Sequence, residues 1–129
     1  MPDVLIEVRG SWLGNRKSLF LEAVHTALVE ALRTIRDEEV LRLIEHAPDS
    51  FVIPQSAGER FTRIEIVLLA GRSLETKRAL YGTIVRKLAP FGVPPQDVKV
   101  VLVEISNENV GIRGGKPVCD VDLGYEVHV

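Results

Sequence analysis

The chain has 129 residues, of which 46% are hydrophobic and 26% are charged, as in an ordinary soluble domain with one buried core. Its net charge of −2 and its scattered basic residues argue against a surface that binds nucleic acid or an anionic membrane. Aromatic residues make up only 5%, too few for a surface on which bases stack. We therefore expect one domain, residues 1–129, with neither of these partners.

Cysteine content and the first residues bear on the compartment. Cys119 is the only cysteine, which excludes an internal disulfide and is compatible with a reducing environment. The amino-terminal residues lack the basic stretch and apolar stretch of a signal peptide. No apolar run approaches the ~20 residues that cross a bilayer. These features predict a cytoplasmic protein.

Apolar periodicity predicts the secondary structure in chain order. The predicted strands are Val4–Val8, Val40–His46, Phe61–Ala70, Val98–Ile105 and Cys119–Val129. The predicted helices are Arg16–Arg33 and Ser73–Leu88, the second with Ser73 as its N-cap. Between the last two strands, residues 107–117 form a glycine-rich loop that no helix pattern follows, which excludes a dinucleotide-binding fingerprint.

The order strand–helix–strand occurs twice, and the two halves, about 1–58 and 59–129, resemble one another. Leu5-Ile6-Glu7 is repeated as Arg63-Ile64-Glu65, and two further segments match at nearly the same offset of about 58 residues. Right-handed crossovers place both helices on one face of a four-stranded sheet, so the fold class is α+β. The other face is expected to be apolar and open, and self-association would cover it.

Pro2 follows the initiator methionine directly. A small second residue permits removal of Met1, which would expose a secondary amine at the tip of a buried strand. Burial without a counter-ion lowers the pKa of an amine, and an amine that is neutral near pH 7 is a general base. If Met1 is retained, the Pro2 nitrogen is an amide and cannot accept a proton.

Other side chains suggest no further chemistry. The three histidines lack the spacing of a zinc or di-iron site, so we expect no metal and no other cofactor. His25 is expected to be a solvated or edge histidine on the flank of its helix. Cys119 has no histidine nearby in the sequence and is expected to be an inert thiol.

Three motifs in this order are specific in combination: Pro2, then Gly71-Arg72-Ser73, then residues 111–115, Gly-Ile-Arg-Gly-Gly. Together they resemble the tautomerase superfamily. The second half is similar to 4-oxalocrotonate tautomerase, and the length resembles the fused, double-length members that include malonate semialdehyde decarboxylase. The resemblance implies a tautomerase fold and a homotrimer with a barrel-like core of sheets.

The resemblance also implies the roles of five residues. Pro2 would be the catalytic base, and Arg72 would bind the substrate carboxylate through its guanidinium fork. Lys99 stands where a second arginine occurs in 4-oxalocrotonate tautomerase. Val110 matches a position that is usually aromatic, and Glu38 falls near the acidic residue that assists the decarboxylases.

The implied activity is that of a cofactor-independent tautomerase or isomerase acting on a small 2-oxo or enol carboxylate. The alternatives are decarboxylation, hydration or dehalogenation of a short unsaturated or 3-oxo acid on the same scaffold, or a non-catalytic trimeric module. Ala70 stands where the decarboxylase carries an additional arginine, which weakens the first alternative. A purely structural alternative for this acidic segment is that Asp37, Glu38 and Glu39 form a solvated connection between a helix and a strand.

Overall fold

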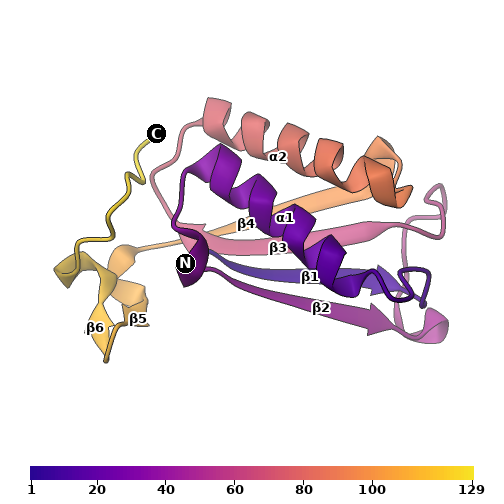
Figure 1. Ribbon diagram of the computed structural model, residues 1–129, viewed down its shortest axis with the longest axis horizontal. Coiled ribbons are helices and arrows are strands. Elements are labelled where there is room, and N and C mark those ends of the chain that lie inside the picture. Colours follow the sequence, from indigo (N-terminus) through magenta and orange to yellow (C-terminus); the bar gives the residue numbers. More distant parts are fainter.

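The structure, a computed structural model, describes all residues 1–129 (Figure 1). Four long strands and two helices follow one another as two β-α-β units, and a short hairpin comes after them. In chain order the elements are β1 (Asp3–Arg9), α1 (Lys17–Leu32), β2 (Val40–His46), β3 (Thr62–Leu69), α2 (Leu74–Leu88), β4 (Val98–Ile105), β5 (Gly111–Ile112) and β6 (Lys116–Pro117). Neither helix has the length and apolar character needed to cross a membrane.

The four long strands form one mixed sheet in the order β2-β1-β3-β4. Within each unit the strands are parallel, and the units join through an antiparallel β1–β3 pair in which Asp3 lies opposite Val67. Both helices lie on the same face of the sheet (Figure 1). The predicted α+β architecture is confirmed. Each helix connects two parallel strands by a crossover, and both crossovers lie on the same side of the sheet.

The two helices have bounds within one residue of those predicted. Ser73 is the N-cap of α2, where its hydroxyl oxygen accepts a hydrogen bond from the Thr76 backbone N–H across 3.2 Å. The α1 helix lacks such a cap and ends at Arg33, whose φ of 57° stops the helical path. Capping satisfies an N–H that would otherwise have no partner at the first turn.

The main core fills the space between the helices and one face of the sheet. Apolar residues alternate along β1 and β3 and recur at helical spacing along α1 and α2. Its largest fully buried side chains include Ile6, Phe20, Leu28, Ile64 and Ile84. This burial fixes the register of the strands, since a slip by one residue would turn each apolar set to the other face.

The opposite face of the sheet is open in the single chain, as expected, but it is not uniformly apolar. Glu7 lies 2.9 Å from His46 and 3.2 Å from Arg63, and Arg63 reaches Glu65 across 3.1 Å. Exposed apolar side chains flank this charged network, and Val103 on β4 is one of them. The face therefore combines ion pairs with apolar patches, a composition suited to a specific contact between copies.

The predicted strand Cys119–Val129 is wrong. Residues Val118–Asp120 form a 3-10 turn, and the segment after it pairs with no strand. Gly124 takes a positive φ of 81°, which interrupts an extended path. Apolar and polar residues alternate from Val121 to Val129 because the apolar ones face inward. Leu123 is buried, and Tyr125 and Val127 pack on a small cluster that contains Met1.

Candidate active site

The site predicted around Pro2 lies at one end of the sheet. There β1 and β2 begin and β3 and β4 end, while the C-terminal segment lies alongside (Figure 1). Pro2 precedes β1, and residues 38 and 39 precede β2. Arg72 follows β3 immediately before α2. The topology thus gathers four separate parts of the chain at this end of the sheet.

The amino terminus is buried at this end. Met1 is 8% exposed, and its side chain packs with Leu69, Val118 and Leu123. The Met1 amino group donates a hydrogen bond to the Glu38 carbonyl oxygen across 2.5 Å. The Pro2 carbonyl oxygen accepts from the Val40 backbone N–H across 3.3 Å. Pro2 is buried as well, so its nitrogen lies out of contact with bulk solvent.

Arg72 is the unusual charge of the site. Its side chain is buried, with 6% of the residue exposed, yet it forms no ion pair with any carboxylate. One guanidinium nitrogen donates to the Leu69 carbonyl oxygen across 3.2 Å, and its Nε has no hydrogen-bond partner. Burial lowers the pKa of Arg72, while Tyr125, Glu104 and Glu39 act in the opposite direction. A buried guanidinium with free donors is suited to an anionic ligand.

Glu38 and Glu39 have different surroundings. The Glu38 carboxylate forms an ion pair with Arg113, and 28% of its side chain is exposed. The Glu39 side chain is fully buried and accepts a hydrogen bond from the Thr34 hydroxyl. Burial raises the pKa of Glu39, although Thr34, His25, the amino terminus and Arg36 all act to lower it. Glu39 therefore has the buried carboxylate that interacts electrostatically with the amino terminus, whereas the resemblance pointed to Glu38 as the assisting acid.

Of the two environments expected for His25, solvated or at the edge of its helix, the structure shows the edge position. Its side chain is 19% exposed, and its Nε2 lies 2.9 Å from Glu39 Oε1 and 3.0 Å from the Arg36 carbonyl oxygen. Glu39 Oε1 has no well-aligned hydrogen-bond donor despite this short distance. The His25 ring therefore has two acceptors in reach, and its contact with Glu39 is chiefly electrostatic.

Tyr125 was missed as a site residue. Its hydroxyl donates to the Met1 carbonyl oxygen across 2.9 Å, although 124 positions separate the two residues in the chain. Burial raises the pKa of Tyr125, Glu38 and Glu39 raise it further, and Arg72 and Arg113 lower it. The sequence placed Tyr125 on one face of a predicted strand, and no local pattern shows which element that face meets.

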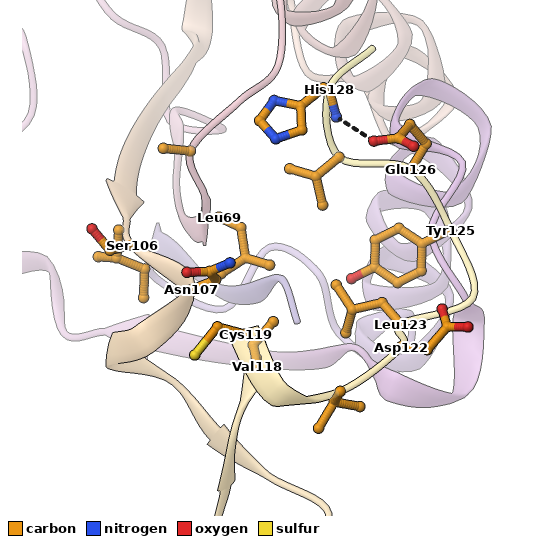
Figure 2. Close-up of a pocket in the computed structure, with 14 residues that line it drawn as sticks. Leu69, Ser106, Asn107, Val118, Cys119, Asp122, Leu123, Tyr125, Glu126 and His128 are labelled. Carbon is orange, nitrogen blue, oxygen red and sulfur yellow. Dashed lines mark hydrogen bonds between the residues drawn. The ribbon is translucent and has the colours of Figure 1, made fainter.

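A cavity of about 460 Å³ adjoins these groups. Figure 2 shows the Tyr125 hydroxyl directed into it, with Leu123 beside the ring and Leu69 and Val118 across the cavity. The last three are the buried side chains that pack against Met1. The space around Met1 and the cavity are thus walled by the same apolar residues. Ala70 also lines the cavity and brings no charge to it.

The two remaining predicted residues differ in location. Val110 packs on the cluster that contains Met1, Leu69 and Val118, so the fold does bring it to the site. Lys99 is exposed and pairs in register with Arg63 near the start of β3. At ~3.3 Å per residue this is about 16 Å along the strand from the Pro2 end. Within one chain Lys99 cannot act together with Pro2.

Comparisons with known proteins identify the family of the chain. The family described as "Tautomerase enzyme" matches residues 38–113, more than half of the chain. The chain therefore belongs to this family of tautomerase enzymes.

Solved structures of similar fold cover nearly the whole chain. The FG41 malonate semialdehyde decarboxylase, inhibited by 3-bromopropiolate, is 25% identical, with a TM-score of 0.82 over 90% of this chain and 92% of that one. The symmetric trimer of Q0 fused 4-OT is 24% identical, with a TM-score of 0.81 over 92% and 97%. A second malonate semialdehyde decarboxylase, studied for decarboxylase and hydratase activities, is 21% identical, with a TM-score of 0.83 over 94% and 100%.

Proposed function

We propose that the protein is a cofactor-independent tautomerase that acts on a small 2-oxo or enol carboxylate, with the imino group of Pro2 as general base. The observation that carries this proposal is the buried guanidinium of Arg72, which has no carboxylate partner in the chain. It lies at the same end of the sheet as the amino terminus. An anionic substrate would supply the missing partner.

Removal of Met1 is the step that creates the base. Once Met1 is removed, the Pro2 nitrogen becomes a secondary amine in a buried, largely apolar site, which favours its neutral form. Pro2 would take a proton from the carbon next to the ketone and return it at another carbon, while Arg72 binds the carboxylate. Cationic and hydrogen-bond donating groups stabilise the negative charge that develops on the enolate oxygen.

Glu39 is the second proton-binding group in this proposal. Its buried carboxyl acts electrostatically on both the amino terminus and Arg72. Once Met1 is removed, Glu39 would be able to exchange a proton with Pro2 during the reaction. We assign this role to Glu39 rather than Glu38, because Glu38 is already paired with Arg113 near the surface.

The test combines mass and activity. Intact mass spectrometry should show a chain that begins at Pro2, and that chain should accelerate ketonisation of phenylenolpyruvate, followed by loss of the enol absorbance. Pro2→Ala should lower this rate by about 10²- to 10⁴-fold, the range of general-base catalysis. The exposed Pro95→Ala is the matched control and should retain full activity. A retained Met1, or full activity in Pro2→Ala, would leave only a non-catalytic module.

Decarboxylation or hydration of a 3-oxo or unsaturated acid is the second candidate. The buried Glu39, with its raised pKa, favours it, because a protonated carboxyl can deliver a proton to a developing carbanion. The absence of a charge at Ala70 disfavours it. Assays with malonate semialdehyde and with 3-halo acrylic acids would separate decarboxylation and dehalogenation from proton transfer alone.

The assembly we propose is a homotrimer. Support comes from the open sheet face with its exposed apolar side chains and from the trimeric relative with the same fold. Lys99 lies on that open face, where a copy of the chain could bring it to a neighbouring site. A cytoplasmic location fits the single cysteine, Cys119, which a reducing compartment would keep as a thiol.

A further inference from the structure

Tyr125 is a polar side chain in contact with Met1 that the proposed reaction has not used. Its hydroxyl donates to the carbonyl oxygen of Met1 across 2.9 Å. The carbon that bears this oxygen is bonded to the Pro2 nitrogen. From the lengths of the C=O and C–N bonds, the Tyr125 hydroxyl oxygen lies within about 5.5 Å of the Pro2 nitrogen.

The Met1 carbonyl oxygen therefore lies where we expect the keto oxygen of a bound substrate. A substrate that exchanges a proton with Pro2 must place the reacting carbon within contact distance of that nitrogen. Its keto oxygen is then one or two bonds farther away, in the region that the Met1 oxygen occupies here. The Tyr125 hydroxyl already points to this region as a hydrogen-bond donor.

The position of Tyr125 does not depend on its bond to Met1. The C-terminal segment is held on one side by the Ser73 backbone N–H, which donates to the Val129 carbonyl oxygen across 2.8 Å. On the other side Arg113 donates to the Asp122 carbonyl oxygen across 2.9 Å. The tyrosine stands between these two attachments, neither of which involves Met1.

We propose that Tyr125 is a catalytic residue that donates a hydrogen bond to the keto and enolate oxygen of the substrate. This inference rests on the proposed function, because it requires Met1 to be removed and Pro2 to be the base. The reaction increases negative charge on that oxygen, and a fixed donor stabilises the charge most in the transition state. Burial keeps the phenol protonated, and therefore able to donate, by raising the pKa of Tyr125.

The first experiment removes only the hydroxyl. Tyr125→Phe should lower kcat for ketonisation of phenylenolpyruvate by about 10²-fold or more, as for loss of one oxyanion donor, with a smaller change in KM. Its affinity for oxalate, a planar mimic of an enolate, should fall as well. Tyr81→Phe is the matched control, because Tyr81 lies on α2 and forms no side-chain hydrogen bond. It should keep both the rate and the affinity.

The second experiment detects the phenol itself. The chain has two tyrosines, so in the Tyr81→Phe background 3-fluorotyrosine replaces Tyr125 alone. The fluorophenol loses its proton at lower pH, and the basic limb of the kcat profile should move to lower pH. A side chain with only a structural role would leave that limb unchanged.

The outcomes separate this inference from the proposed function. If Pro2→Ala is inactive but Tyr125→Phe and the fluorotyrosine protein behave as the unmodified chain, the role of Tyr125 is overturned and the base remains. If Pro2→Ala is fully active, the proposed function fails and this inference fails with it. The same holds for a chain that neither ketonises phenylenolpyruvate nor binds oxalate.

Discussion

Glu38 and Glu39 are adjacent in the chain, yet their carboxylates lie in opposite surroundings. Glu38 forms an ion pair with Arg113, whereas the Glu39 side chain is fully buried beside Thr34 and His25. The 3-10 turn Arg36–Glu38 ends between them and directs only Glu39 inward. One buried carboxyl, one buried guanidinium and the amino terminus therefore interact in a region of low polarity, where proton affinities are most easily shifted.

The pH dependence of stability should reveal this burial. Glu39 has a pKa raised above its ordinary value of 4.5, chiefly because burial disfavours the charged form. A carboxyl of this kind stabilises the fold most when it is protonated, below pH 4.5, and that contribution is lost as the pH rises through the raised pKa. Glu39→Gln should therefore have a higher Tm than the unmodified chain at pH 7 to 8, and the difference should shrink toward pH 4.

Glu38→Gln is the control for that prediction, because Glu38 is partly exposed and ion-paired at the surface. Its Tm should stay close to that of the unmodified chain at every pH, since exposed pairs contribute about 0–1 kcal/mol. The interpretation of Glu39 would be wrong if Glu39→Gln were less stable than the unmodified chain at pH 8. The measurement is thermal unfolding by circular dichroism in matched buffers.

Arg72→Met should separate binding from stability. The variant loses the charge-assisted hydrogen bonds between the guanidinium and the substrate carboxylate, which contribute about 1.5–3 kcal/mol. The KM for phenylenolpyruvate should therefore rise by about 10- to 100-fold. The free energy of unfolding should not fall, because the variant replaces a buried, unpaired guanidinium with an apolar chain of similar length. Steady-state kinetics and urea unfolding measure the two effects.

The matched control is Arg78→Met, which removes an arginine that is 62% exposed and paired with Glu75 on the surface of α2. Both KM and the unfolding free energy should stay near those of the unmodified chain. A KM for Arg72→Met equal to that of Arg78→Met would show that the buried guanidinium does not bind the substrate.

The sequence was sufficient for the two helices and for the four strands of the main sheet. Apolar spacing predicted α1 and α2 within one residue, because each helix has a single buried stripe. Pro2 and Arg72 were assigned to one site by the resemblance, and both stand next to strand ends that the β1–β3 pairing brings together. The helices and strands depend on local pattern and on the handedness of crossovers.

The remaining site residues depend on contacts that local pattern does not encode. The choice between Glu38 and Glu39 turns on the exact rotation of a three-residue 3-10 turn. The location of Tyr125 depends on the path of a segment without ladder hydrogen bonds, whose alternation looked like that of a strand. Lys99 was placed by resemblance alone, and the register puts it at the other end of the sheet.

Alanine substitutions at two glycines of the second β-α-β unit are expected to change the stability in opposite directions. Gly71 has a φ of 138°, and a Cβ there would lie 2.7 Å from the His128 ring, so Gly71→Ala must displace the end of the C-terminal segment. We expect lower stability and, through movement of Tyr125, lower activity. Gly82 lies in α2 with open space around its Cβ position. Gly82→Ala should stabilise the fold by about 1 kcal/mol, with unchanged activity.

Thermal unfolding and ketonisation kinetics check both variants. The contradictory result for Gly71 is an alanine variant with unchanged Tm and rate, which would mean that the C-terminal segment is free to move without effect on the site. For Gly82, a fall in Tm would contradict the open surroundings of its Cβ position.

The open face of the sheet should control assembly. Val103 on β4 is 39% exposed on the face opposite the helices, although it is a β-branched apolar residue in a regular strand. A carboxylate at this position would be buried without a partner in a trimer but would be solvated in the single chain. Val103→Asp should therefore shift the mass measured by light scattering from trimer to monomer, with the helical circular dichroism retained.

Val52→Asp is the control for charge alone, because Val52 is 95% exposed in the loop between β2 and β3. That variant should remain trimeric at the same concentration. Activity is a second measurement on the Val103→Asp monomer. If a neighbouring copy supplies Lys99 to the site, the monomer should lose ketonisation activity although its own Pro2 and Arg72 are intact. A fully active monomer would show that one chain holds the complete site, and a monomeric unmodified chain would contradict the proposed assembly.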